Sequence, residues 1–349
     1  MENRKIRVAI THGDTNGIGY ELILKVFEDP EMLELCTPII YGSPKAAAFH
    51  CKAMGIETQL NVISNAEEAK GDKVNLLAAV PDEVKVELGQ PTAESAEAAR
   101  KAMERAKEDL QKRLYDVLVT APVVPAGTPA REEKALTMMV CERVRIGLQT
   151  THLPIKDVPQ AITTEKIVEK GRIFHASLRR DFRISNPRLA ILALNPQMGS
   201  EEEEVIKPAI EELEKLGIQA FGPYLADEFF GDDLYLEFDG VLAMYDDQGT
   251  VAFRSIAQEY GVKLKAGISA IVVTPDQGPS FDSAGKGIAD PQSLRHAVYT
   301  AIDMYRHRAE YDEPMGNPLP KLYHEKREDG DKARFAVKAK DQFKSAPEK

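Results

Sequence analysis

The chain is poor in residue types that mark particular classes of protein. It has 349 residues, no tryptophan and three cysteines, Cys36, Cys51 and Cys141. Because the cysteines are widely spaced and odd in number, they form no metal-ligand pattern, and we expect reduced thiols in a cytoplasmic protein. No apolar run approaches the roughly 18 to 20 residues that span a bilayer, so we expect no membrane segment. The short apolar stretch near the N-terminus predicts a first strand and not a signal peptide.

An excess of basic residues is also absent. The 45 lysines and arginines are outnumbered by 56 aspartates and glutamates, which gives a formal net charge of -11. Nucleic acid is therefore excluded as a general partner, because a phosphate backbone needs a basic surface. The acidic total still leaves room for a local basic site that binds one small phosphate.

Short apolar runs alternate with helical stretches along the chain, which is typical of the α/β class. The clearest strands are Arg7–Thr11, Tyr115–Thr120 and Leu189–Leu194, and a long helix begins with capping oxygens on Thr92 and Ser95. This alternation predicts an open, mostly parallel sheet. Ligands of such a sheet bind at the carboxyl ends of its strands or in a cleft between domains.

The C-terminal part of the chain differs in composition from the rest. Beyond a helix predicted for residues 291–308, the sequence EKREDGDKARFAVKAKDQFKSAPEK has few apolar residues. We therefore expect a folded region over residues 1–312 and a peripheral polar tail over residues 313–349.

The sequence THGDTNGIGYE, from Thr11 to Glu21, lies between the first strand and the first helix. Gly13, Gly17 and Gly19 allow a tight turn, and a helix N-terminus can hold an anion. The glycines are spaced G-x-x-x-G-x-G, which is not the dinucleotide fingerprint G-x-G-x-x-G. An anion-binding loop and a structural turn both stay open.

Polar residues follow three later apolar strands. His152 lies in QTTHLPIKDVPQAIT, Asp246 and Asp247 lie in MYDDQGTVAF, and a third loop reads LNPQMGSEEEE. Imidazole is the commonest metal-binding side chain, although a lone histidine is more often a hydrogen-bonded structural residue. The two carboxylates suit a hard cation and equally a solvated turn.

Six segments of the chain, taken in order, resemble the 4-phosphohydroxythreonine dehydrogenase family of vitamin B6 biosynthesis. They are THGDTNGIGYE, YDVLVTAPV, TTHLP, ALNPQMG, AMYDDQG and DQGPSFDSAGKGIAD. The resemblance covers about Arg7 to Arg308. It implies a homodimer of two α/β/α domains per subunit, similar to isocitrate and isopropylmalate dehydrogenases, with the active site in the cleft near the dimer interface. It also implies NAD as oxidant of 4-phosphohydroxythreonine, a divalent metal that polarises the resulting ketone, and loss of carbon dioxide.

The resemblance places a metal site on three positions. The family holds its metal by three histidines, and these fall on His152, Gln197 and Asp246 of this chain. Zinc prefers imidazole, whereas magnesium and manganese accept oxygen ligands, so one imidazole, one amide and one carboxylate make a different site. Asp247, which the YDDQG segment keeps, is the candidate catalytic residue.

The implied substrate contacts are also changed. The family lysine falls on Arg254, its asparagine on Lys263 and its arginine on Val272, where we expect nothing adjacent to restore the lost charge. Arg254 and Lys263 remain the candidate substrate-binding residues. A G-H-T segment that contacts the substrate phosphate region is missing from VVPAGTPAREEKALTMM, which we expect to run straight into a helix.

These losses are correlated, because the glycines, prolines and apolar strands of the scaffold are kept while the site residues change. We therefore predict a family member whose native activity is lost or altered. The alternative is a catalytically silent member, or a scaffold redesigned on this backbone, that folds, dimerises and binds a phosphorylated metabolite. A generic phosphate-sugar or acyl enzyme outside the family is a third hypothesis, placed well below these.

Overall fold

The computed structural model describes residues 4–81, 84–123, 135–258 and 260–316 of the chain. The chain divides into two compact units, Met1–Tyr311 and Asp312–Lys349, and every described strand belongs to the first unit. From position 317 onward, the expected polar tail lies outside the described residues. The boundary at residue 312 and the division of residues 1–312 into two subdomains stay predictions.

Twelve strands of the described ranges form one sheet, in the order β3-β4-β2-β1-β5-β12-β11-β6-β7-β10-β8-β9. Their bounds are β1 (Ile6–Thr11), β2 (Cys36–Gly42), β3 (Leu60–Ile63), β4 (Val74–Ala78), β5 (Val117–Thr120), β6 (Leu136–Val140), β7 (Arg145–Leu148), β8 (Arg188–Leu192), β9 (Gln219–Tyr224), β10 (Gly240–Ala243), β11 (Val262–Ala266) and β12 (Val272–Pro275).

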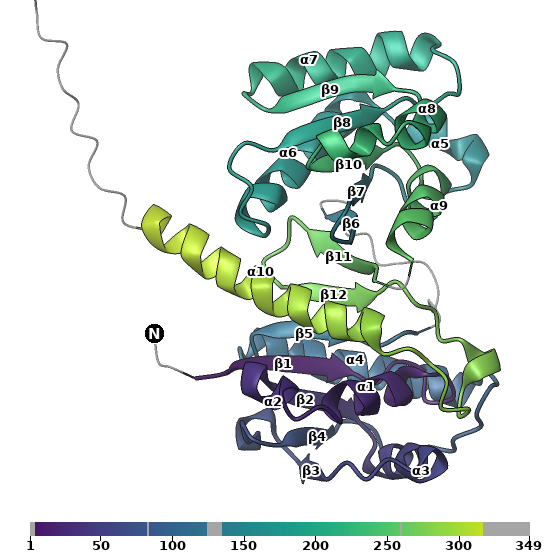
Figure 1. The fold of residues 1–349 in the computed structure, drawn as a ribbon, viewed down its shortest axis with the longest axis vertical. Helices are drawn as coiled ribbons and strands as arrows, with labels where there is room; N and C mark the ends of the chain where they lie inside the picture. Colours follow the sequence, from purple (N-terminus) through teal and green to yellow (C-terminus); the bar gives the residue numbers. More distant parts are fainter. Residues whose placement is uncertain (1–3, 82–83, 124–134, 259, 317–349) are drawn as a thin grey trace, which may run out of the picture. The chain divides into compact units, whose positions relative to one another are not determined.

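The sheet consists of two parallel blocks with antiparallel strands between them. The six strands from β3 to β12 in the sheet order are parallel to one another, and so are the four strands from β7 to β9. β11 and β6 join the blocks through antiparallel pairs (Figure 1). The expected α/β class with mostly parallel strands is confirmed.

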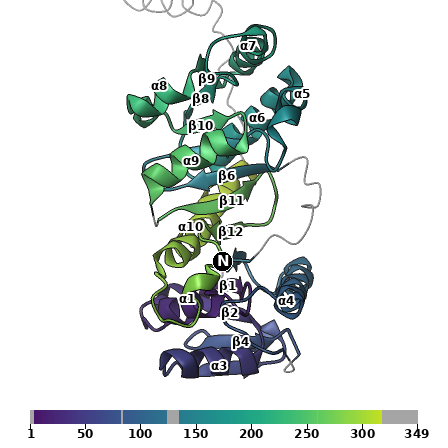
Figure 2. The same ribbon diagram turned by 90° about the vertical axis from the view of Figure 1, so that its right-hand side faces the viewer.

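Helices cover both faces of this sheet. They are α1 (Gly19–Phe27), α2 (Met32–Leu35), α3 (Pro44–Met54), α4 (Ala93–Gln111), α5 (Val158–Ala161), α6 (Thr164–Arg180), α7 (Lys207–Lys215), α8 (Ala226–Gly231), α9 (Asp246–Ala257) and α10 (Gln292–Gly316). In the first block, α1 and α4 lie on opposite faces (Figure 2). The expected cap of α4 is confirmed, because the Thr92 side chain accepts a hydrogen bond from the Ser95 amide at 3.1 Å. α10 ends at Gly316 and is longer than the helix we predicted to end at Arg308.

The two faces of the sheet differ in how their cores are divided. On one face, a single hydrophobic cluster extends from Val8 in β1 to Leu189 in β8. On the other face, one cluster surrounds Ala9 and α4, and a separate cluster surrounds Ala190 and α9. Successive residues of a strand point to opposite faces, which is why neighbouring positions belong to different clusters. The central strands carry polar side chains between the two smaller clusters.

The segment before β6 contradicts one expectation. Leu136–Val140 does not enter a helix, because it pairs on one side with β11 and on the other with β7. Its β-branched Thr137 and Val140 suit an extended strand of this kind. Most of the segment in which the G-H-T motif is missing, residues 124–134, lies outside the described residues.

None of the helices in the described ranges is long and apolar enough to cross a membrane. The three cysteines are free thiols, in keeping with the expectation from their spacing.

Candidate functional site

The loops with the candidate residues leave neighbouring strands at the same edge of the sheet. β7, β10 and β8 are adjacent and parallel, so their carboxyl ends lie together. His152 follows β7, and Asp246 follows β10 at the start of α9. The Asp246 carboxylate accepts a hydrogen bond from the His152 amide at 3.1 Å, and its Oδ2 lies 3.6 Å from His152 Nδ1. The structure therefore brings these two residues together within one chain.

His152 is held in an uncommon backbone conformation. Its φ is 56°, in the left-handed region that residues other than glycine rarely adopt. The second carboxylate oxygen of Asp246 accepts a hydrogen bond from Thr250 Oγ1 at 3.0 Å, so both oxygens have partners. The His152 side chain remains 67% exposed. Asp246 thus fixes the loop while the imidazole stays accessible.

Glu202 organises the loop that contains Gln197. Its fully buried carboxylate accepts hydrogen bonds from the amides of Leu194 and Asn195, both at 2.9 Å, and from the amide of Gly199 at 2.7 Å. Burial favours the neutral acid, but these hydrogen bonds prevail and lower the pKa of Glu202. In the sequence, Glu202 was only one member of an acidic run. Gln197 itself is exposed.

Gln248 is a second positioning residue that the sequence did not reveal. Its Oε1 accepts a hydrogen bond from the Met244 amide at 2.7 Å, and its Nε2 donates to the Ala193 carbonyl at 2.7 Å. It therefore fixes the start of α9 to the ends of β10 and β8. The YDDQG segment contains this glutamine, but nothing in the sequence identified its partners.

The donors present do not fit the three-ligand metal site that the resemblance implies. Within the described ranges, no group of three His, Cys, Asp or Glu side chains is placed to hold a metal ion. His152 and Asp246 supply two donors, and both Asp246 oxygens already accept hydrogen bonds. The third position, Gln197, offers a neutral amide, which is a weaker donor than imidazole for zinc.

The two candidate substrate-binding residues converge on one carboxylate. Asp276 is 7% exposed and lies just after β12. It accepts hydrogen bonds from Arg254 Nε at 3.0 Å and Arg254 Nη2 at 3.3 Å, and Lys263 Nζ lies 2.7 Å from its Oδ1. The hydrogen bond that Arg254 donates to Asp276 raises the pKa of Arg254. Two cations therefore share one nearly buried anion, which leaves an excess of positive charge there.

Asp247 and Arg254 lie on one face of α9, seven positions apart. Seven residues are close to two helical turns and about 10 Å of rise. Asp247 is exposed in the first turn, where the helix dipole favours a carboxylate. An acidic and a basic side chain thus lie along the same exposed strip of helix. The catalytic role of Asp247 stays a prediction.

The glycine loop before α1 is part of the packed interior. Residues 11–20 are all buried. The amide of Asp14 donates to the Pro122 carbonyl at 3.0 Å, and the amide of Ile18 donates to the Pro279 carbonyl at 3.1 Å. A helix N-terminus binds an anion through free amides, and these amides are used within the fold. The structural reading of the loop is therefore the one that the geometry favours.

The glycines of this loop are needed for close packing. A Cβ atom on Gly19 would lie 2.1 Å from the His12 carbonyl oxygen, which no side chain tolerates. His12 itself is fully buried and stacks on Tyr20 at a centroid distance of 5.1 Å. Within the described residues, neither ring nitrogen of His12 has a hydrogen-bond partner.

We expect His12 to make the fold sensitive to acid. Burial lowers the pKa of His12 to about 4 from 6.5. A histidine with a lowered folded-state pKa contributes stability that is complete above pH 6.5 and is lost as the pH falls towards 4, because the unfolded chain binds the proton first. The loss is on the order of 3 kcal/mol. Urea unfolding at pH 7.5 and 5 should show a smaller loss in His12→Phe than in wild type, with His296→Phe as control. Equal losses in all three proteins would contradict this origin.

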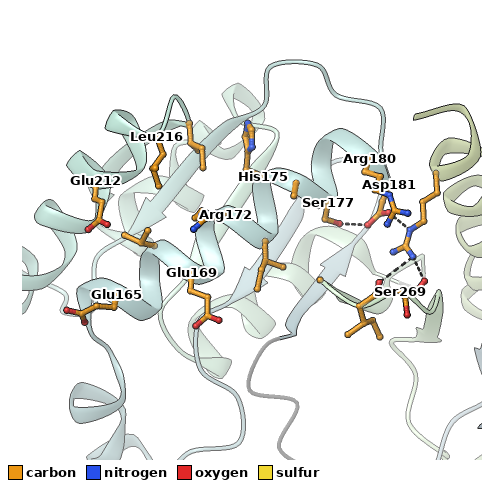
Figure 3. A pocket seen from close by; sticks show the side chains of 17 residues that line it. Glu165, Glu169, Arg172, His175, Ser177, Arg180, Asp181, Glu212, Leu216 and Ser269 are labelled. Atoms are coloured by element: carbon orange, nitrogen blue, oxygen red, sulfur yellow. Dashed lines mark hydrogen bonds and ion pairs between the residues drawn. The ribbon is translucent and has the colours of Figure 1, made fainter. Parts of the chain in front are cut away.

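A cavity of about 920 Å³ lies away from the candidate residues, along α6 and α7 (Figure 3). At one end of it, Asp181 accepts hydrogen bonds from Arg308 Nε and Ser177 Oγ, both at 2.6 Å. Asp181 and Arg308 are 3% and 7% exposed, so this ion pair connects α6 to α10 as part of the fold. None of the candidate site residues lines the cavity.

Known proteins resemble the chain in both sequence and fold. Residues 34–128 and 126–301 match the family described as pyridoxal phosphate biosynthetic protein PdxA. The chain belongs to the PdxA family. A 4-hydroxythreonine-4-phosphate dehydrogenase of Bacteroides thetaiotaomicron is 45% identical over 96% of this chain and 98% of the relative. A protein of the same name from a Sulfurihydrogenibium species is 32% identical over 87% of this chain and 99% of the relative.

Solved PdxA structures share the fold. The 4-hydroxythreonine-4-phosphate dehydrogenase of Burkholderia phymatum matches with a TM-score of 0.69 and 28% identity, over 86% of this chain and 99% of its own. A protein described as a putative dehydrogenase of the same name from Salmonella typhimurium matches with a TM-score of 0.74 and 23% identity, over 86% of this chain and 100% of its own, which supports the fold alone. Family membership, expected from six ordered motifs, is thereby confirmed.

Proposed function

We propose that the chain is an oxidoreductase acting on 4-hydroxythreonine 4-phosphate or a closely similar phosphorylated hydroxy amino acid, through a site altered from the family pattern. The observation that carries this proposal is the pair of cations on Asp276, one of which, Arg254, lies in the last turn of the helix whose first turn carries Asp247. The 45% identity to a relative named for this activity, over nearly the whole chain, supports retained chemistry more than its loss.

Three residues have roles in the proposed reaction. Arg254 and Lys263 bind the phosphorylated end of the substrate, because charge-assisted hydrogen bonds are the strong ones. Asp247 accepts the proton of the secondary alcohol as that alcohol is oxidised, a contribution typical of a positioned general base. Asp276 positions the two cations and touches no reacting atom.

NAD is proposed as the oxidant, since the relatives are named dehydrogenases. It supplies an acceptor for hydride. The glycine loop, whose amides donate within the fold, does not fit its pyrophosphate, and we assign no residues to the dinucleotide. A divalent metal is not part of the proposal, because the described residues provide only the two donors His152 and Asp246.

The test is NADH formation by the purified full-length protein with 4-hydroxythreonine 4-phosphate and NAD. We expect substrate-dependent NADH that persists after treatment with EDTA, since the described ranges of the chain form no three-ligand site to empty. Loss of activity with EDTA and its return with zinc, magnesium or manganese would contradict the metal-free site. Absence of NADH from a preparation that binds the substrate would contradict the oxidoreductase proposal.

The second candidate function is a silent family member that binds a phosphorylated metabolite without oxidising it. The changed donor at Gln197 favours it, because the family's metal chemistry cannot operate through a neutral amide in the same way. Binding of 4-hydroxythreonine 4-phosphate without turnover is its signature. In either case we propose a homodimer in the cytoplasm, for which light scattering of the purified protein gives the mass.

A further inference from the structure

β11 carries two lysines on one face of the sheet. Val262, Leu264 and Ala266 are buried on the face with the continuous core, and the alternate positions, Lys263 and Lys265, are only partly buried on the other face. This alternation is typical of a strand with one apolar face. The two ammonium groups thus point to the same side as the smaller clusters around α4 and α9.

Hydroxyl groups from the neighbouring strands lie on the same face. Lys265 pairs with Thr137 of β6, and Lys263 pairs with Thr274 of β12. Lys265 Nζ donates a hydrogen bond to Thr137 Oγ1 at 2.8 Å, and the hydroxyls of Thr274 and Thr120 are 2.6 Å apart. Four adjacent strands, β5, β12, β11 and β6, therefore present a polar strip of lysine and threonine.

This polar strip falls between two apolar clusters. The cluster with α4 reaches the strip at Leu118 and Val272, and the cluster with α9 begins at Met139 and Ile146. A lysine between two apolar clusters is unfavourable for packing, because its partly buried ammonium group needs hydrogen-bond partners for three donors. The one hydrogen bond of Lys265 in the described structure satisfies one of them.

The charge of Lys265 is not offset by a carboxylate in the described part of the chain. Lys263 and Arg254 both contact Asp276, whereas no ion pair of Lys265 is found among the described residues. Burial and then the nearby charge of Lys265 lower the pKa of Lys170 on α6. In a chain with a net charge of -11, this concentration of positive charge favours an anion.

Lys265 also lies next to Val272, the position at which the resemblance implies that an arginine has been lost. β11 pairs antiparallel to β12, and the register ends with Leu264 opposite Val273. Extending this register by one residue places Lys265 opposite Val272. Side chains directly opposite in an antiparallel pair have Cβ atoms about 4.5 to 5.5 Å apart on the same face. A lysine thus lies near the position at which the arginine implied by the resemblance is replaced by Val272, and whether it restores the charge there stays a prediction.

We propose that Lys265 binds the phosphate group of the substrate, together with the nearby threonine hydroxyls of the polar strip. Lys265 is then a binding and specificity-determining residue, and this inference rests on the proposed function for the identity of the ligand. A phosphate monoester carries more charge than a carboxylate, so the effect of Lys265 falls on the phosphorylated form of the ligand.

The experiment is calorimetric titration of 4-hydroxythreonine 4-phosphate, and separately of unphosphorylated 4-hydroxythreonine, into the full-length protein. We expect Lys265→Met to weaken binding of the phosphate ester about 10- to 100-fold, the loss of one charged hydrogen bond. Adding Val272→Arg to Lys265→Met should restore part of the affinity, because the new cation lies one strand away on the same face. Lys215→Met removes an exposed lysine of α7 and should leave binding unchanged.

Thermal unfolding of each variant, with the rescue by Val272→Arg, separates loss of binding from loss of fold. Unchanged affinity in Lys265→Met, or equal weakening for the ligand without phosphate, would overturn the inference. If wild type binds the ester without turnover while Lys265→Met binds it weakly, the oxidation proposal fails and the role of Lys265 stands. If wild type does not bind the ester at all, both proposals fail.

Discussion

Replacing Asp247 by asparagine is expected to lower kcat about 10²- to 10⁴-fold, the usual contribution of a positioned general base. The amide is nearly the same shape but cannot accept the alcohol proton. KM should change little, because the phosphate-binding cations are on later turns of α9 and on β11. The measurement is steady-state NADH formation over a range of substrate concentrations.

Asp227→Asn is the matched control for this prediction. Asp227 is also an exposed carboxylate in the first turn of a helix, but that helix is α8 and does not carry Arg254. It should keep wild-type kcat. A kcat for Asp247→Asn within about threefold of wild type would remove Asp247 from the mechanism, since general bases contribute far more.

Replacing Arg254 by methionine is expected to raise KM for the phosphorylated substrate about 10- to 100-fold, with a smaller effect on kcat. Methionine keeps much of the apolar stem but removes the guanidinium that contacts Asp276 at 3.0 Å. Arg254→Lys should recover part of the affinity, because an ammonium keeps the charge without the two-pronged geometry. The KM and kcat values of both variants test this order.

Arg179→Met is the control, because Arg179 is likewise an exposed arginine in the last turn of a helix, α6. Its KM should equal that of wild type. If Arg254→Met and Arg179→Met have the same KM, the phosphate does not bind at Arg254 and the convergence on Asp276 is purely structural.

The sequence revealed the elements whose local pattern is strong. The apolar runs of β1, β5 and β8 and the start of the capped helix α4 were predicted close to their observed bounds. The polar loops at the strand ends were found for the same reason, because glycine and polar residues directly follow apolar runs. Parallel pairing then brings His152 and Asp246 together, which ordered motifs were enough to anticipate.

Other elements depend on long-range contacts that a single sequence does not display. β11 reads VKLKA, and its two lysines hide the apolar alternation that identifies the strand. Its position beside β6 follows from antiparallel pairing across more than a hundred residues of chain. The charge at Lys265 could be placed opposite Val272 only once that register was known.

The positioning residues were missed for a different reason. Glu202 is one of four consecutive glutamates in the sequence, and burial alone distinguishes it from its neighbours. The glycine loop was ambiguous because glycines allow both close approach to an anion and close packing. Burial of the entire loop and the internal hydrogen bonds of its amides favour packing.

The most direct test of the proposed site is a crystal structure of the full-length protein with 4-hydroxythreonine 4-phosphate. We predict phosphate oxygens about 2.7 to 2.9 Å from the side-chain nitrogens of Arg254, Lys263 and Lys265, the range of charge-assisted hydrogen bonds. The secondary alcohol should then face Asp247 on the same strip of α9. Substrate bound instead in the cavity along α6 and α7, or with its phosphate away from all three cations, would contradict the proposed site.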